Sequence, residues 1–124
     1  MRTPKNILER RQSARIAQSL PFKIGHEGYE IAARTVNISA HGAMCVVDRA
    51  IPVMAQLRVA LTLSASSKEK VIHATGVVVR NEADPGSDKH FIAIYFSQIK
   101  PVDQKVLNQH IEQWLKSTGQ RISK

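Results

Sequence analysis

The residues best suited to chemistry are three arginines near the start of the chain. Arg10, Arg11 and Arg15 lie within residues 9–15, a stretch with little apolar periodicity. A guanidinium group donates paired hydrogen bonds to phosphate oxygens and to the O6/N7 edge of guanine. We therefore interpret this stretch as one half of an anion-binding site, and a guanine nucleotide is the first ligand class to consider.

A second polar motif follows further along the chain, with the spacing Asn37-x-Ser39-x-x-Gly42. Asn and Ser side chains bond nearby backbone amides, and Gly can adopt a positive φ or leave room for a close approach. An ordinary capped turn explains this motif when it is taken alone. The same turn can also present amides and polar side chains to a phosphate or a guanine edge, which makes it a candidate second half of the site.

No set of residues in the sequence points to catalysis. Hydrolysis or group transfer needs a nucleophile with a base, a pair of carboxylates or a metal cluster. The acidic residues fall mostly in expected loops, and the single Cys45 is expected in the core. The five histidines show no metal-ligand spacing: His26, His41, His73, His90 and His110. We predict a protein that is not an enzyme and uses neither a metal nor a cofactor.

Composition favours a single domain with anionic partners. The chain has 124 residues and a net charge of +8, which suits one core. Residues 1–15 hold five basic residues against one acidic residue, so the charge is concentrated at this end. No apolar run approaches the roughly 20 residues that span a bilayer, and the first residues lead into no signal-peptide core. We expect a cytoplasmic protein without membrane insertion.

The apolar pattern predicts the elements that must position these residues. Alternation predicts six short strands at 20–24, 29–36, 43–47, 56–63, 71–80 and 90–96, with a bend or bulge at Gly76. Apolar steps of three and four predict a helix that begins at Pro101 and ends near Lys116. Residues 1–19 lack such a pattern and are expected to be a flexible arm. Six strands at regular spacing favour a small barrel or sandwich, with the helix on one opening or flank.

Arg11-x-x-x-Arg15 followed by Asn37-x-Ser39-x-x-Gly42 resembles the two-part signature of the PilZ domain family. The resemblance spans residues 8–115 and includes the spacing between the motifs, the last two strands and the closing helix. It implies an all-β fold with one helix: a six-stranded antiparallel PilZ-type β-barrel plus a C-terminal α-helix. The domains implied are a flexible basic arm over 1–19, the barrel and helix over 20–117, and a basic tail over 118–124.

The resemblance also implies a ligand, because family members bind the bacterial second messenger cyclic di-GMP. Its binding residues would be Arg11 and Arg15 from the arm, and Asn37, Ser39 and Gly42 from the turn. Arg10 resembles a position where some members carry an extra Arg and bind a stacked ligand dimer. Ala93 departs from a common Gly in the family, and no Trp or Tyr stands beside Arg80 to stack on a base.

We therefore expect a non-catalytic receptor in which cyclic di-GMP orders the arm against the turn and changes the surface offered to a downstream effector protein. Two alternatives stay open. One is a small basic barrel that binds single-stranded nucleic acid, which is disfavoured because aromatics make up only 5% of the chain. The other is a PilZ adaptor that acts without a ligand, against which the intact motifs argue. Nucleic acid is not the expected partner.

Overall fold

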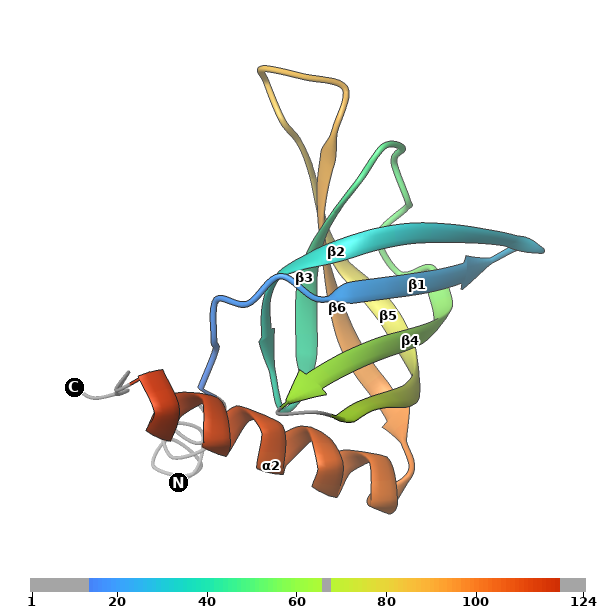
Figure 1. Cartoon of the computed structure of the whole chain (residues 1–124). Helices are drawn as coiled ribbons and strands as arrows, with labels where there is room; N and C mark the ends of the chain where they lie inside the picture. The colour runs from blue at the N-terminus through green and yellow to red at the C-terminus, as the bar shows by residue number, and fades with distance from the viewer. Residues whose placement is uncertain (1–13, 66–67, 119–124) are drawn as a thin grey trace, which may run out of the picture.

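Six antiparallel strands close into a barrel in the computed structural model, which describes residues 14–65 and 68–118 (Figure 1). Around the barrel the strand order is β1-β2-β3-β6-β5-β4, and β4 pairs again with β1. The elements are β1 (Pro21–His26), β2 (Tyr29–Ser39), β3 (Gly42–Val47), β4 (Gln56–Ala65), β5 (Lys68–Ala83), β6 (His90–Ile99) and α2 (Pro101–Thr118). The predicted barrel with one C-terminal helix is therefore confirmed.

The barrel interior is filled by the alternate residues of each strand. In β6, Ile92, Ile94 and Phe96 are buried whereas Tyr95 points outward, as the alternation predicts. Cys45 of β3 is buried in this core, and burial raises the pKa of its thiol to about 12. Because only the thiolate is strongly nucleophilic, Cys45 is a packing residue, as expected.

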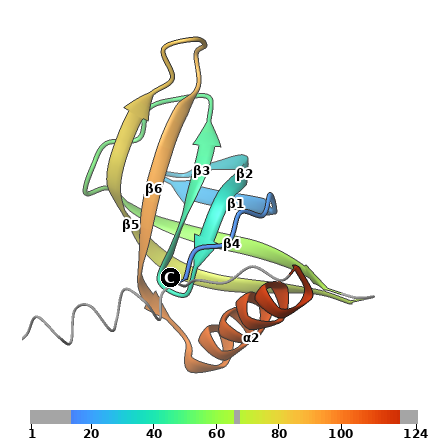
Figure 2. The ribbon, with the colours of Figure 1, turned by 90° about the vertical axis from the view of Figure 1, so that its left-hand side faces the viewer.

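Helix α2 covers the lower opening of the barrel (Figures 1 and 2). Its inward face buries Leu107, His110 and Ile111, and Val106 and Trp114 pack partly against the core. Asp103 in the first turn and Lys116 in the last complement the helix dipole. The helix predicted from Pro101 onward is confirmed.

The strands extend further than the apolar pattern indicated. β4 and β5 form a long hairpin whose outer pairs are polar, such as Ser64 with Glu69. The residues between the predicted strands 56–63 and 71–80 are therefore mostly strand as well. Likewise β5 continues to Ala83 and β6 to Ile99. The ends of these strands pair through backbone hydrogen bonds, which need no apolar side chains. The alternation of apolar residues therefore does not predict them.

The first strand is also shifted, because Leu20 is buried but precedes β1, which begins at Pro21. The bulge predicted at Gly76 is confirmed, since the register between β5 and β6 shifts between Thr75 and Gly76. A second shift lies between Val78 and Arg80, close to the candidate site.

Candidate functional site

The segment that leads into the barrel is fixed to β2. Ile16 and Ile38 exchange two backbone hydrogen bonds, of 2.9 and 3.0 Å, and the Ile16 side chain is 0% exposed. We expected residues 1–19 to be a flexible arm; in the structure, residues 14–19 contact β2 instead of extending away from the barrel. The apolar pattern did not predict this contact, because Ile16 is one buried residue in an isolated bridge and its neighbours show no apolar periodicity. Residues 1–13 lie outside the described residues.

Thr35 of β2 provides a second anchor for this segment. Its hydroxyl donates to the Gln18 carbonyl at 2.6 Å and accepts from the Leu20 amide at 2.9 Å, and its own amide donates to the Leu20 carbonyl at 3.0 Å. Thr35 is buried, so these bonds are shielded from water. The backbone that carries Arg15 therefore enters the site in a defined position.

Arg15 joins the two motifs that the sequence analysis singled out. Its Nη1 donates a 2.7 Å hydrogen bond to Oδ1 of Asn37, across 22 positions in the chain. This bond uses only part of the guanidinium fork, whose remaining donors stay available to an anion. Arg10 and Arg11, which we predicted to act with Arg15, lie outside the described residues.

A β-bulge turns Asn37 toward Arg15. Thr35 pairs with Cys45 and Asn37 pairs with Met44, so Val36 is an extra residue in β2. An extra residue reverses the alternation of the strand. Thr35 and Ile38 are therefore both buried, whereas Asn37 between them is partly exposed. The bulge aims the amide of Asn37 out of the barrel.

Asn37, Ser39 and Gly42 are not turn residues, although we expected a turn across 37–42. Asn37 and Ser39 end β2, Gly42 begins β3, and the turn itself contains only Ala40 and His41. The Ser39 hydroxyl accepts from the His41 amide at 3.3 Å and lies 3.4 Å from the Gly42 carbonyl, to which it donates. Ser39 is 3% exposed, so its side chain holds the shape of this tight turn.

Gly42 is required by a close approach and not by a positive φ. Among the described glycines only Gly28 has a positive φ. Gly42 pairs with Tyr95 of β6, and a Cβ on Gly42 would collide with the carbonyl oxygen of Ile94. Of the two roles considered for this glycine, only the close approach applies.

These residues border a shallow surface pocket of about 480 Å³. Arg15, Ser39 and Gly42 line one side of it, and Val79, Ala93 and Tyr95 from β5 and β6 line the other, with His41 at the turn. The Tyr95 side chain is 52% exposed. Tyr95 was not predicted as a site residue. The alternation in its strand indicates that it faces outward, but nothing in the sequence indicates that it pairs with Gly42.

The pocket combines a cationic fork, polar side chains and an apolar wall. An anion with a flat ring system is complementary to such a surface, because the arginine binds charge and Tyr95 offers a π-face. In the part of the chain that the structure describes, no group of His, Cys, Asp and Glu could hold a metal ion. No described helix is long and apolar enough to cross a membrane.

The fold and the site together define a class: a small closed β-barrel with a helix over one opening and a polar surface site where the entering segment meets the β2–β3 turn. The family model for the PilZ domain matches residues 9–113. The chain belongs to the PilZ domain family, as its two motifs indicated. A comparison with curated protein sequences finds no match.

Solved structures share the fold. The inhibitor of motility MotI/DgrA from Bacillus subtilis is 30% identical with a TM-score of 0.75, over 85% of this chain and 51% of that chain. The PilZ domain of YcgR from Escherichia coli, solved with c-di-GMP, is 14% identical with a TM-score of 0.60, over 90% and 99%. PlzA from Borreliella burgdorferi, in complex with c-di-GMP, is 11% identical with a TM-score of 0.59, over 99% and 60%. The chain thus spans about half the length of the motility inhibitor.

Proposed function

We propose that this protein is a non-catalytic receptor for cyclic di-GMP that passes the signal to a partner protein in the cytoplasm. Membership of the PilZ family supports the ligand, as do the two similar domains that were solved with c-di-GMP. The similarity to an inhibitor of motility supports an output through another protein.

The observation that carries the proposal is the 2.7 Å bond from Arg15 to Asn37. It brings the second arginine of the RxxxR motif to the first residue of the NxSxxG motif. In this proposal Arg15 and Asn37 bind a phosphate or a guanine edge of the ligand, and Ser39 and Gly42 shape the turn that receives it. Arg11, and Arg10 beside it, would close over the ligand from the upstream segment.

Ordering the arm costs free energy that the ligand contacts must offset. Residues 14–19 contact β2 through Ile16 and Thr35, so in this proposal the ligand has to order only the part of the arm that carries Arg11. Ordering the backbone costs roughly 1–2 kcal/mol per residue, and each charge-assisted hydrogen bond contributes about 1.5–3 kcal/mol. Two or three such bonds can therefore offset the ordering of a few residues.

Calorimetric titration of the full chain with cyclic di-GMP tests the proposal. We expect saturable binding at micromolar ligand, and much weaker binding of GTP. Arg11→Ala and Arg15→Ala each remove a charge-assisted bond of about 1.5–3 kcal/mol, so each should raise Kd by about ten- to a hundredfold. The stoichiometry reports whether one or two ligands bind, and Arg10→Ala tests the second.

The matched control is Arg49→Ala, because Arg49 is an exposed arginine whose ion pair with Asp48 lies outside the pocket. It should bind like wild type. Absence of saturable binding by the folded wild-type chain would refute the proposed ligand. Equal Kd values for wild type and Arg15→Ala would refute the assigned site.

A further inference from the structure

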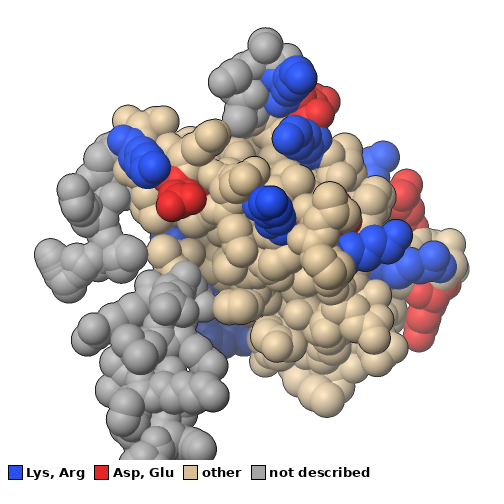
Figure 3. Space-filling view, turned by 90° about the horizontal axis from the view of Figure 1, so that it is seen from below, with Lys and Arg blue, Asp and Glu red and all other residues tan. Residues whose placement is uncertain are grey.

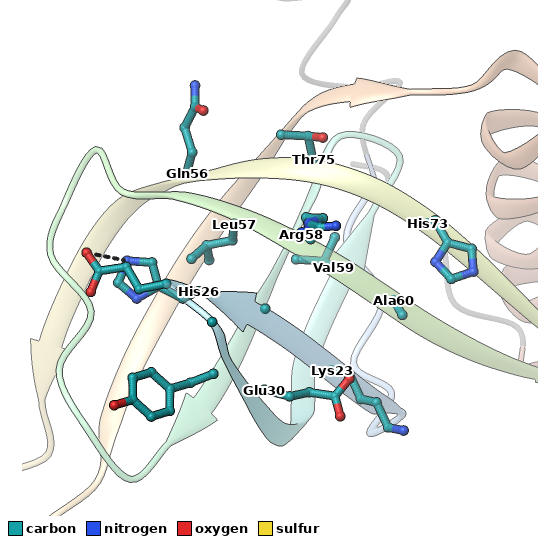
Figure 4. A pocket seen from close by; sticks show the side chains of 14 residues that line it. Lys23, His26, Glu30, Gln56, Leu57, Arg58, Val59, Ala60, His73 and Thr75 are labelled. Atoms are coloured by element: carbon teal, nitrogen blue, oxygen red, sulfur yellow. Dashed lines mark ion pairs between the residues drawn. The ribbon is translucent and has the colours of Figure 1, made fainter.

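A second surface site lies on β1, β4 and β5, away from the pocket described above. Ala60 of β4 pairs with Lys23 of β1 on one side and with His73 of β5 on the other. Arg58 is two residues from Ala60 on the same strand and therefore on the same outer face. Figure 4 shows these four residues together, with Ala60 between Lys23 and His73 and Arg58 next along β4.

This geometry surrounds a methyl group with three nitrogen-bearing side chains. Diagonal neighbours on one face of an antiparallel pair lie about 7–8 Å apart, so Arg58 is close to both Lys23 and His73. Gly25 pairs with Arg58 and adds no side chain, which leaves the floor of the groove low. The groove has a volume of about 620 Å³.

The two cations are free to bind a partner. Among the contacts of the described residues, neither Lys23 nor Arg58 makes an ion pair or a side-chain hydrogen bond, whereas Arg15, Arg34, Arg49 and Arg80 all do. Lys23, Arg58 and His73 are all exposed. An arginine fork without a partner, above a floor of small residues, is complementary to a carboxylate.

Acidic side chains near the two cations restrict the occupant. Glu30 of β2 pairs with Gly25, which pairs with Arg58 on its other side, so Glu30 lies across Gly25 from Arg58 and diagonal to Lys23 (Figure 4). Glu27 lines the end formed by the β1–β2 hairpin, where His26 pairs with it at 3.9 Å. A continuous phosphate backbone running along the groove would meet this negative charge. A protein segment can place a carboxylate over Ala60, on the side of Arg58 that faces away from Glu30, and a neutral or basic residue beside Glu30.

From these observations we propose that the groove over Ala60 docks an acidic segment of a partner protein, with a carboxylate held by Arg58 and Lys23 and supported by His73. The groove shares no lining residue with the ligand pocket. The docking site therefore stands independently of the proposed ligand and is available to a partner while the ligand is bound.

The test uses the full chain, labelled with ¹⁵N, and a short acetylated glutamate-rich peptide as the probe, with its glutamine analogue of equal length for comparison. We expect saturable amide shifts centred on Lys23, Ala60 and His73 with the glutamate peptide and none with the analogue. Arg58→Glu replaces attraction by repulsion and should weaken peptide binding by at least about tenfold. Ala60→Leu fills the floor and should weaken it without a change of charge.

Lys89→Glu is the matched control, since Lys89 is an exposed cation on the β5–β6 hairpin outside the groove. It should bind the peptide like wild type, and all variants should retain the wild-type unfolding midpoint because the changed positions face solvent. Shifts that do not saturate, or an unchanged Kd in Arg58→Glu, would overturn the proposal. Tighter binding of oligothymidylate at the same amides would replace the acidic partner by a nucleic acid. Each of these measurements is made without cyclic di-GMP, so its failure leaves the proposed ligand intact.

Discussion

Tyr95 is the only Phe, Tyr or Trp among the residues that line the candidate pocket. Its side chain stands on the outer face of β6, opposite Gly42, where the missing Cβ of that glycine lets β3 come close. Arg15 and Tyr95 line the same pocket, so under the proposed function we expect a guanine ring bound by Arg15 to stack on Tyr95.

Replacing Tyr95 by Ala should weaken cyclic di-GMP binding, because stacking of a base on an aromatic side chain contributes about 1–3 kcal/mol. Tyr95→Phe keeps the π-face and should retain most of the affinity. Calorimetric titration measures both. Tyr29→Ala is the control, since Tyr29 is 69% exposed but lies outside the pocket. Wild-type affinity in Tyr95→Ala would show that the base does not stack there.

At the same scale, the sequence pointed to residues whose positions depend on different kinds of contact. Arg15 and Asn37 were predicted as two parts of one ligand site through their motifs, and a hydrogen bond joins them in the structure, while their role in binding a ligand stays a prediction. Gly42 was predicted from its spacing, but its role depends on the Ile94 carbonyl, which belongs to a strand far along the chain. Tyr95 was not predicted at all. A contact set by the register between distant strands has no local signature in the sequence.

Helix α2 contacts both segments that form the candidate site. Nε2 of Gln104 donates to the carbonyl of Ala40 in the β2–β3 turn at 3.0 Å. Further along the helix, Nε2 of His110 lies 2.8 Å from Oε1 of Gln18, in the segment that carries Arg15. The helix therefore fixes the turn relative to the arginine, although it contributes no residue to the pocket itself.

Weakening these two bonds should reduce ligand affinity at a distance. Each neutral hydrogen bond contributes about 0.5–1.5 kcal/mol, so Gln104→Ala with Gln18→Ala should raise the Kd for cyclic di-GMP by several-fold. Amide hydrogen exchange at Ala40 and His41 should become faster in the same variant. Lys105→Ala, an exposed change on the same helix, controls for an effect on α2 alone. Unchanged affinity with faster exchange would show that the helix supports the turn without influencing the ligand.

His110 also makes the attachment of α2 sensitive to pH. Its side chain is 7% exposed, and burial lowers its pKa below the usual 6.5. The folded state then disfavours the charged imidazole, whereas the unfolded chain protonates it freely. Stability is therefore complete above the ordinary pKa and is lost as the pH falls from there toward the lower folded value.

Urea unfolding at a series of pH values measures this loss. The unfolding free energy of wild type should decline as the pH falls below about 6.5. His110→Gln, which keeps a polar group for Gln18, should show a smaller decline over the same interval. His73→Gln is the control, because His73 is exposed. An equal decline in His110→Gln would assign the effect to other groups.

At the scale of elements, apolar periodicity predicted the segments that face the core. It did not predict the strand extensions and the bridge that depend on backbone pairing. The helix from Pro101 and the inward faces of β4 and β6 follow from their apolar spacing. The extension of β2 to Ser39 does not, because the bulge at Val36 reverses the alternation just before the motif. The pairing of Ile16 with Ile38 was missed for a related reason, since a single isolated bridge has no periodic pattern.

The closed barrel separates two surfaces of different chemistry on one small molecule. The ligand pocket lies where β2, β3, β5 and β6 meet the entering segment, and the groove over Ala60 lies on β1, β4 and β5. The pairing of β1 with β4 closes the barrel and brings β1, β4 and β5 together, on strands that include the groove. The number of strands was predictable from the sequence, and the family resemblance implied that they close into a barrel. The order in which they pair was not predicted, because closure joins segments far apart in the chain.

The net charge of +8 belongs to the whole molecule, and its distribution predicts how binding responds to salt. Seen from the α2 side, Lys and Arg are dispersed among uncharged residues rather than joined in one basic patch (Figure 3). In the sequence, positive charge is most concentrated in residues 1–15, which include Arg11 and Arg15. A ligand that meets a few arginines releases few counterions, whereas a nucleic acid strand that follows a basic surface releases many.

We therefore expect the affinity for cyclic di-GMP to fall only gently as sodium chloride is raised, with a slope of about one to two in a plot of log Kd against log salt. Oligothymidylate should bind more weakly at every salt concentration, and its binding should vanish near physiological ionic strength. Titrations of the full chain with both ligands over the same salt series measure the two slopes. Tight, steeply salt-dependent binding of the oligonucleotide, with no response to cyclic di-GMP, would identify the barrel as a nucleic-acid-binding protein and assign Arg11 and Arg15 to the phosphate backbone of a strand.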